Sequence, residues 1–195
     1  PVPLVIAGTH ETHPGLFTLL ERSVSLTEAH DMFVHYLAIA FGLQPPKASE
    51  LPSLGAAERR RWRSSWRKLL QGWGMDANGP AGAVLKGWVE SRFGLVPSYH
   101  KAPLARFPSP AWVAYLQEKA ASRYNNNIHQ QLDLLYEFSQ WALRRILPPD
   151  GSTPARHLRL WRGSNQCEEQ VLAGRLQDRR CTIRLNNLVS FSQSQ

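Results

Sequence analysis

Apolar residues recur every three or four positions through most of the first 150 residues, which is the spacing of helices with one buried face. Ser25 and Glu28 have the spacing of a capping box at the start of one such helix, and Gly42 supplies its end. Its predicted inward stripe consists of Leu26, Ala29, Phe33, Tyr36, Leu37 and Ala40. The stripe of another predicted helix consists of Trp62, Trp66, Leu69, Leu70 and Trp73.

Proline and glycine mark the limits of three further predicted helices. Pro80 opens one that ends before Gly94. Ser109 caps the next, after an extended connection that contains several prolines. The longest helix is predicted over 128–147, and the prolines that follow it predict a linker over 150–154.

After residue 155 apolar residues alternate with polar ones, which is the pattern of half-buried strands. Strands are predicted over 157–162, 180–185 and 188–192, with a short helix over 168–177. The predicted fold class is therefore α+β. A mostly helical portion over 1–150 precedes the first strands of a β-rich domain over 155–195.

The composition fits a folded protein with a buried core. Hydrophobic residues make up 43% of the chain and charged residues 19%, which excludes a mostly disordered chain. No apolar run reaches the ~18 residues of a membrane span, and the opening segment lacks the basic flank of a signal peptide. Two cysteines exclude a disulfide framework and a four-cysteine zinc site. We expect a cytoplasmic protein without a membrane span.

The formal net charge of +8 at pH 7 suggests an anionic partner, although the base composition of the source genome would explain the same balance. The densest basic cluster is interleaved with the tryptophan stripe, so we expect the arginines to form the solvated face opposite a buried one. A nucleic-acid surface would need those aromatic rings exposed for stacking on bases, and no nucleic-acid partner is predicted. The cluster consists of Arg59, Arg60, Arg61, Arg63, Arg67 and Lys68.

The motifs of several common enzyme classes are missing from the sequence. There is no GxxxxGK[ST] phosphate loop, no GxGxxG after a predicted strand and no GxSxG nucleophile elbow. His10 and His13 lack the spacing of an HExxH zinc pair, and we interpret this segment as a surface turn. No metal site is predicted.

Arg162 stands out because it shares a predicted strand face with two leucines and comes directly before Gly163. An arginine on an apolar face is costly unless its charge is paired. At a strand end its planar guanidinium can reach into a cleft, where it suits a pyrophosphate or a carboxylate. The alternative is a structural ion pair with Glu137 or Asp133.

Two hydroxyl groups mark the last predicted strand. Alternation places Ser190 and Ser192 on one face, with Val189 and Phe191 on the other. The hydroxyls can bind a ligand or simply face solvent, and the strand pattern leaves both interpretations open.

The order strand, Arg162–Gly163, helix, strand and Ser190–Ser192 resembles the first two parts of the Arg–Ser–Glu signature of ADP-ribosyltransferases. Longer segments resemble the NAD⁺–dinitrogenase-reductase ADP-ribosyltransferase family over nearly the whole chain. These segments are Asn78–Gly94, Gln131–Phe138, Leu160–Gly163 and Arg184–Ser192.

The resemblance implies that residues 155–195 begin an ADP-ribosyltransferase fold that binds NAD⁺ as a substrate. It implies transfer of ADP-ribose to one arginine of the nitrogenase iron protein, which switches nitrogen fixation off. The implied partners are the iron protein and a PII-type nitrogen-signalling protein, and a separate glycohydrolase would reverse the modification.

The resemblance also implies a set of NAD⁺-binding residues. Arg162, with Gly163, would hold a phosphate or a ribose oxygen, and Ser190, with Ser192, would hydrogen-bond the ribose or orient the catalytic carboxylate. Phe191 or Trp161 would stack near nicotinamide. Asn165 and Asn187 are turn residues close enough in sequence to join the site.

The sequence departs from the signature at its third part. No acidic residue follows Ser192, so the signature glutamate is expected beyond Gln195, and no catalytic residue is assigned within residues 1–195. We therefore expect a C-terminally truncated chain that does not transfer ADP-ribose by itself. The competing hypothesis is a non-enzymatic helical module that binds an acidic partner through Arg59–Lys68.

Overall fold

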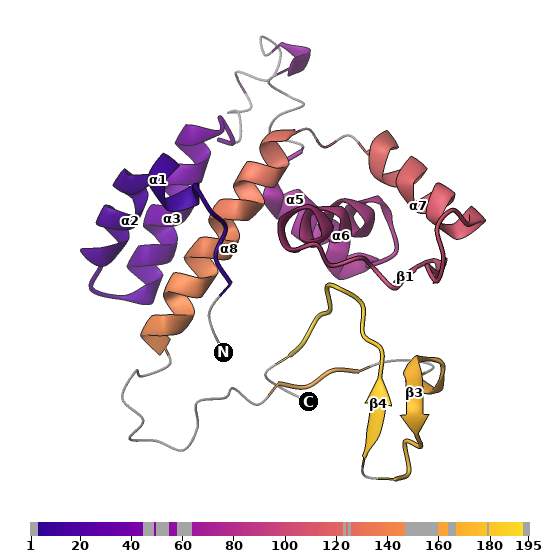
Figure 1. Ribbon diagram of the computed structural model, residues 1–195. Coiled ribbons are helices and arrows are strands. Elements are labelled where there is room, and N and C mark those ends of the chain that lie inside the picture. Colours follow the sequence, from indigo (N-terminus) through magenta and orange to yellow (C-terminus); the bar gives the residue numbers. More distant parts are fainter. Residues whose placement is uncertain are drawn as a thin grey trace. The chain divides into compact units, whose positions relative to one another are not determined.

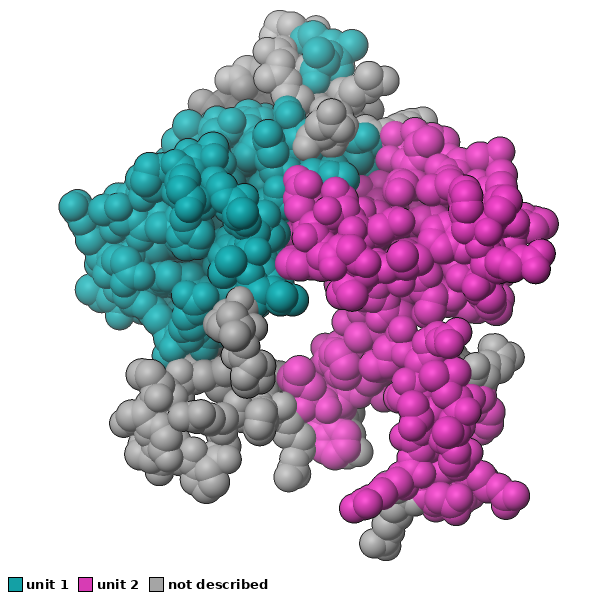
Figure 2. All heavy atoms as spheres, viewed as in Figure 1, with its two compact units in different colours: residues 1–71, 123–152 teal, residues 72–122, 153–195 magenta. Residues whose placement is uncertain are grey.

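The computed structural model describes residues 4–44, 49, 55–57, 64–122, 124, 126–146, 160–163, 167–178 and 180–192 (Figure 1). The chain forms two compact units, which are coloured separately in Figure 2. Unit 1 contains residues 1–71 and 123–152, and unit 2 contains residues 72–122 and 153–195. The units interleave along the sequence, and the linear division into 1–150 and 155–195 stays a prediction.

Unit 1 is built from helices. They are α1 (Thr9–Thr12), α2 (Pro14–Glu21), α3 (Leu26–Ala40), the first residues of α5 (Trp66–Met75) and α8 (Asn126–Ile146). The predicted cap of α3 is confirmed, because the Ser25 hydroxyl accepts a hydrogen bond from the Glu28 amide at 3.1 Å. The Glu28 carboxylate accepts from the Val24 amide at 2.7 Å, one residue before the expected partner. Gly42, with φ of 61°, follows the helix.

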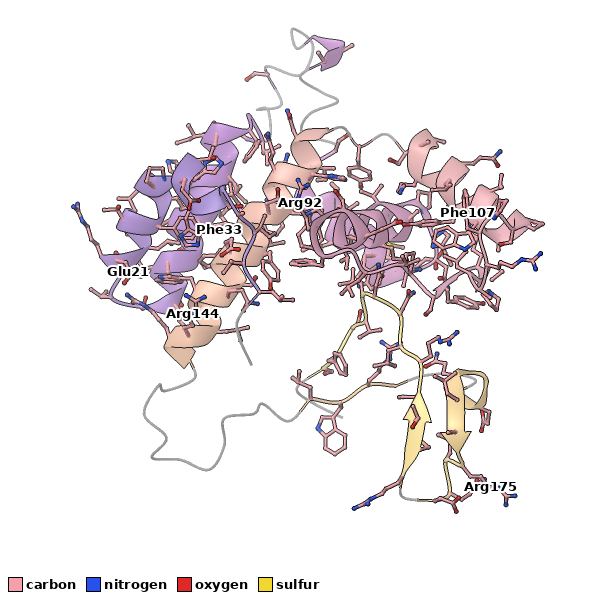
Figure 3. All side chains as sticks on the ribbon, in the orientation of Figure 1. Glu21, Phe33, Arg92, Phe107, Arg144 and Arg175 are labelled. Atoms are coloured by element: carbon pink, nitrogen blue, oxygen red, sulfur yellow. The ribbon has the colours of Figure 1, made fainter. Side chains whose placement is uncertain are left out.

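The core of unit 1 lies between α2, α3 and α8. Phe33 of α3 stacks on Phe138 of α8 with ring centroids 4.2 Å apart and planes 8° from parallel. Figure 3 labels Phe33 among these helices. Leu26, predicted to face inward, is exposed instead, because it is the first residue of its helix. The buried cluster consists of Leu16, Leu20, Ala29, Phe33, Leu37, Leu134, Phe138 and Trp141.

The predicted basic face is described only in part. Arg59, Arg60, Arg61, Trp62 and Arg63 lie outside the described residues. Arg67 and Lys68 of α5 are exposed, as predicted. Trp66 packs half-buried against the core of unit 1, and the Arg67 guanidinium lies 5.4 Å from the centroid of the Trp66 ring.

Unit 2 contains α6 (Pro80–Phe93), the short strands β1 (Tyr99–His100) and β2 (Ala102–Pro103), and α7 (Pro110–Ala121). Pro80 occupies the first turn of α6 and Gly94, with φ of 65°, ends it, as predicted. Ser109 caps α7 through the Trp112 amide. Every residue of α6 from Ala81 to Val89 is buried, so this helix is enclosed rather than amphipathic.

The rest of unit 2 is a two-stranded antiparallel sheet of β3 (Val171–Gly174) and β4 (Cys181–Ile183), preceded by a 3₁₀ turn, Cys167–Gln170 (Figure 1). The predicted helix over 168–177 is therefore wrong. So short a segment has little helical stability of its own, and pairing with β4 satisfies its backbone instead. The mostly helical α+β class is confirmed.

The last predicted strand, 188–192, is also wrong as a continuous strand. It is reduced to one antiparallel bridge, in which Trp161 and Ser192 exchange backbone hydrogen bonds of 2.7 and 2.8 Å. Residues 157–159 of its predicted partner lie outside the described residues. Within the described part of the chain, no helix has the length and apolar character needed to cross a membrane.

Gly82 provides a test of the packing in unit 2. A Cβ atom at this position would overlap the carbonyl oxygen of Ala77, in the turn before α6. We expect Gly82→Ala to lower the free energy of unfolding by about 1–3 kcal/mol through overpacking, although alanine favours helix. Denaturant unfolding monitored by circular dichroism measures this change.

Gly74→Ala is the matched control, because a Cβ atom on Gly74 of α5 would meet no heavy atom within 4 Å. This variant should be neutral or more stable by up to about 1 kcal/mol. Equal stability changes in the two variants would contradict the packing described for Gly82.

Candidate functional site

Unit 2 contains a cavity of about 410 Å³, which is within the range of small-molecule sites. Its wall combines the end of α5, the turn before α6, the segment around β1 and β2, and the C-terminal residues. The lining residues are Trp73, Ala77, Asn78, Lys86, Ser98, Tyr99, Pro103, Ala105, Arg162, Gln170, Leu172, Arg184, Asn186, Leu188, Val189 and Ser190.

Arg162 and Ser190 meet at this cavity, as the predicted site requires. The Arg162 guanidinium donates to the Ser190 carbonyl oxygen at 3.1 Å, which fixes one end of the fork. Glu137, suggested by the sequence as an ion-pair partner for Arg162, instead accepts from the Ile6 amide at 2.6 Å and contacts His10. The described hydrogen-bond partner of Arg162 is therefore a backbone carbonyl and not the Glu137 carboxylate.

The Ser190 hydroxyl is also oriented by the structure. It accepts a hydrogen bond from the Trp73 indole N–H at 3.0 Å. Because a hydroxyl can donate as well as accept, the Ser190 O–H can still donate to a bound molecule. Trp73 was predicted to belong to the buried stripe of its helix. In the structure its indole N–H donates to the Ser190 hydroxyl.

The other predicted binding residues have different positions. Among the described residues, the cavity lining includes neither Gly163, Phe191 nor Ser192. The Phe191 side chain is half-exposed, and Ser192 pairs through its backbone with Trp161. Asn165 lies outside the described residues. The NAD⁺-binding role of this set stays a prediction.

Lys86 is the lining residue that the sequence analysis missed. It lies in the middle of α6 and is 1% exposed, which is rare for a lysine. Its ammonium group donates to the Asn78 side-chain oxygen at 3.1 Å and contacts Nδ1 of His100 at 3.1 Å. The sequence feature that indicates the burial of Lys86 is its position as the single charged residue in the apolar stretch 80–89.

His100 connects Lys86 to a carboxylate. Its Nε2 atom lies 3.1 Å from Oε2 of Glu118, which also accepts from Lys101 at 2.6 Å. Burial lowers the pKa of His100, so its ring is neutral at pH 7. A neutral ring that donates from Nε2 to Glu118 has a lone pair on Nδ1 to accept from Lys86.

The charge of Lys86 is destabilised by its surroundings. Burial lowers the pKa of Lys86 to about 8, although the Asp76 and Glu118 carboxylates act in the opposite direction. Lys86 is therefore still mostly protonated at pH 7, as a buried cation.

Asn186 and Asn187 attach the C-terminal segment to the rest of the cavity wall. The Asn186 side chain accepts from the Ser98 amide at 3.1 Å and donates to the Tyr99 carbonyl at 2.8 Å. The Asn187 amide donates to the carbonyl oxygens of Lys86 and Leu95 at 3.1 and 2.8 Å. Asn187, predicted as a turn residue, therefore also forms tertiary contacts.

The electrostatics of the cavity favour an anion. Lys86, Arg162 and Arg184 line it, and no carboxylate is among its described lining residues. Amide and hydroxyl groups supply further donors. No group of histidine, cysteine or acidic side chains suited to a metal ion occurs in the part of the chain that the structure describes. The arrangement suits phosphate oxygens.

Comparison with known proteins places the whole chain in a family. The model of the dinitrogenase reductase ADP-ribosyltransferase (DRAT) family matches residues 1–195. The chain belongs to this family. The NAD(+)--dinitrogen-reductase ADP-D-ribosyltransferase of Rhodospirillum rubrum is 46% identical over 188 residues, which cover 96% of this chain. The match spans 66% of that relative's length, and no solved structure matches the chain.

The buried charge of Lys86 makes the stability of this DRAT family member depend on pH. Above pH 10.5 the lysine is neutral in both the folded and unfolded states, and below about pH 8 it is charged in both. Stability relative to Lys86→Met should therefore rise by about 3 kcal/mol between pH 8 and 10.5. Urea unfolding of both proteins across this range measures the difference, and a difference independent of pH would contradict the assignment.

Proposed function

We propose that this protein transfers ADP-ribose from NAD⁺ to an arginine of dinitrogenase reductase, the nitrogenase iron protein, and thereby switches nitrogen fixation off. The family match over residues 1–195 carries the proposal. The name of the Rhodospirillum rubrum relative supports NAD⁺ as donor and dinitrogenase reductase as acceptor. The cationic cavity that joins Arg162 to Ser190 supports a phosphate-containing donor.

The reaction exchanges one bond at the ribose for another. The bond between C1′ of the ribose and the nicotinamide nitrogen breaks, and its electron pair leaves with nicotinamide. A guanidinium nitrogen of the acceptor arginine bonds to C1′ and gives up a proton. Positive charge develops on the ribose in between, so a nearby carboxylate, rather than a cation, stabilises the transition state.

The cations of the cavity therefore suit the other part of the donor. Arg162 and Arg184 line a wall without a described carboxylate, which favours the pyrophosphate and disfavours an oxocarbenium-like ribose. In this proposal Arg162 binds and orients the donor, since its guanidinium is already held by the Ser190 carbonyl. The Ser190 hydroxyl, held by Trp73, donates to a ribose oxygen.

The proposal extends to regulation and location on the basis of the family resemblance. A PII-type nitrogen-signalling protein is proposed as a regulatory partner, and the cytoplasm as the compartment where the iron protein is modified. A non-enzymatic binding module is not favoured, because the family match covers the whole sequence.

Radiolabelled NAD⁺ and purified iron protein test the activity. A chain that includes the signature glutamate should attach label to an arginine of the iron protein. In that chain, Arg162→Ala should lower kcat/KM at least tenfold, because one charged hydrogen-bond donor is lost. Arg175→Ala removes the same charge from the turn after β3, away from the cavity, and should be indistinguishable from the parent (Figure 3). Absence of labelling by the parent, or equal activity in all three proteins, would overturn the proposal.

A further inference from the structure

The buried Lys86 residue is part of the cavity wall, and its ammonium group has no described counter-ion in contact. Its two hydrogen-bond partners are the Asn78 amide oxygen and His100. Among the described residues, no carboxylate forms an ion pair with it. Burying a charge without a paired charge in contact is costly, so the buried ammonium group lowers the free energy of unfolding.

The Lys86 ammonium also retains a donor for a ligand. An ammonium group has three N–H bonds, and Asn78 and His100 account for two of them. Lys86 is part of the cavity wall, together with Arg162 and Arg184. An anion in this cavity would supply a third hydrogen-bond acceptor and a negative charge in direct contact, in addition to the Asp76 and Glu118 carboxylates that act on Lys86 without forming an ion pair.

We propose that Lys86 binds the pyrophosphate of the ADP-ribosyl donor, as a cation additional to Arg162. The proposal rests on the function proposed above and assigns to the helical part of unit 2 a direct role in donor binding. Asn78 and His100 are positioning residues, which hold the ammonium group in place. Glu118 fixes the orientation of the His100 ring through Nε2.

The chemistry distinguishes pyrophosphate binding from recognition of the nucleoside. A buried ammonium group recognises phosphate oxygens and has little to offer the adenine base. ADP-ribose, which contains the pyrophosphate, and adenosine, which lacks it, therefore separate the two roles. Inorganic pyrophosphate tests whether the same group binds without its nucleoside.

Isothermal titration of the full chain with ADP-ribose tests the proposal. Lys86→Met should weaken ADP-ribose binding roughly ten- to a hundredfold, because one charge-assisted hydrogen bond is lost. Adenosine affinity should stay the same. Inorganic pyrophosphate should compete with ADP-ribose in the parent and compete less well in the variant. Arg175→Met is the control, because it removes one charge of unit 2 outside the cavity.

Lys86→Gln is a second variant without the charge, for use if Lys86→Met does not fold. Glutamine lacks the charge and keeps an N–H donor for the polar groups around Lys86, and melting curves show which variants fold. A folded Lys86 variant that binds ADP-ribose as tightly as the parent would overturn the proposal, and so would an equal loss of adenosine affinity. If the parent itself binds neither NAD⁺ nor ADP-ribose, the proposed function fails as well.

Discussion

Four hydrogen bonds from two side-chain amides attach the C-terminal segment of unit 2 to its helical part. Asn186 bonds the backbone of Ser98 and Tyr99, and Asn187 bonds the carbonyl oxygens of Lys86 and Leu95. A two-stranded sheet such as β3–β4 is marginally stable by itself, and these contacts attach the segment that follows β4 to α6 and to the segment around β1. Because Ser190 follows three residues after Asn187, the same contacts bring the Arg162–Ser190 pair to the cavity.

Three basic residues line the cavity, and the stability of the fold does not require their positive charges there. Lys86, Arg162 and Arg184 line one wall, and Lys86 is buried although burial opposes its charged form. A protein selected for stability alone would place an apolar side chain at the centre of α6. Positions at which a buried charge lowers stability in this way are commonly functional. Binding of an anionic donor would account for the three cations in the cavity wall.

Local signals predicted the helices well, whereas tertiary contacts determined the site. Ser25, Pro80, Gly94 and Ser109 act on the backbone next to them, so their caps and stops could be recognised in the sequence. Residues 171–174 form a strand because they pair with Cys181–Ile183, a contact that no local pattern contains. The burial of Lys86 and the four bonds of the asparagine pair likewise depend on residues distant in sequence. The strand pattern singled out Arg162 and Ser190, the resemblance implied their role, and a hydrogen bond joins them in the structure.

We propose that the asparagine contacts form the NAD⁺ site, and Asn187→Asp tests this proposal most directly. The substitution keeps the size of the side chain but replaces an N–H donor with a carboxylate oxygen facing two carbonyl oxygens. The measurement is NAD⁺ affinity in the full chain, with hydrogen exchange of residues 180–192 followed in parallel. We expect at least a tenfold loss of NAD⁺ affinity and faster exchange in that segment, while helical circular dichroism is retained. Unchanged NAD⁺ affinity in a variant whose C-terminal segment exchanges faster would contradict it.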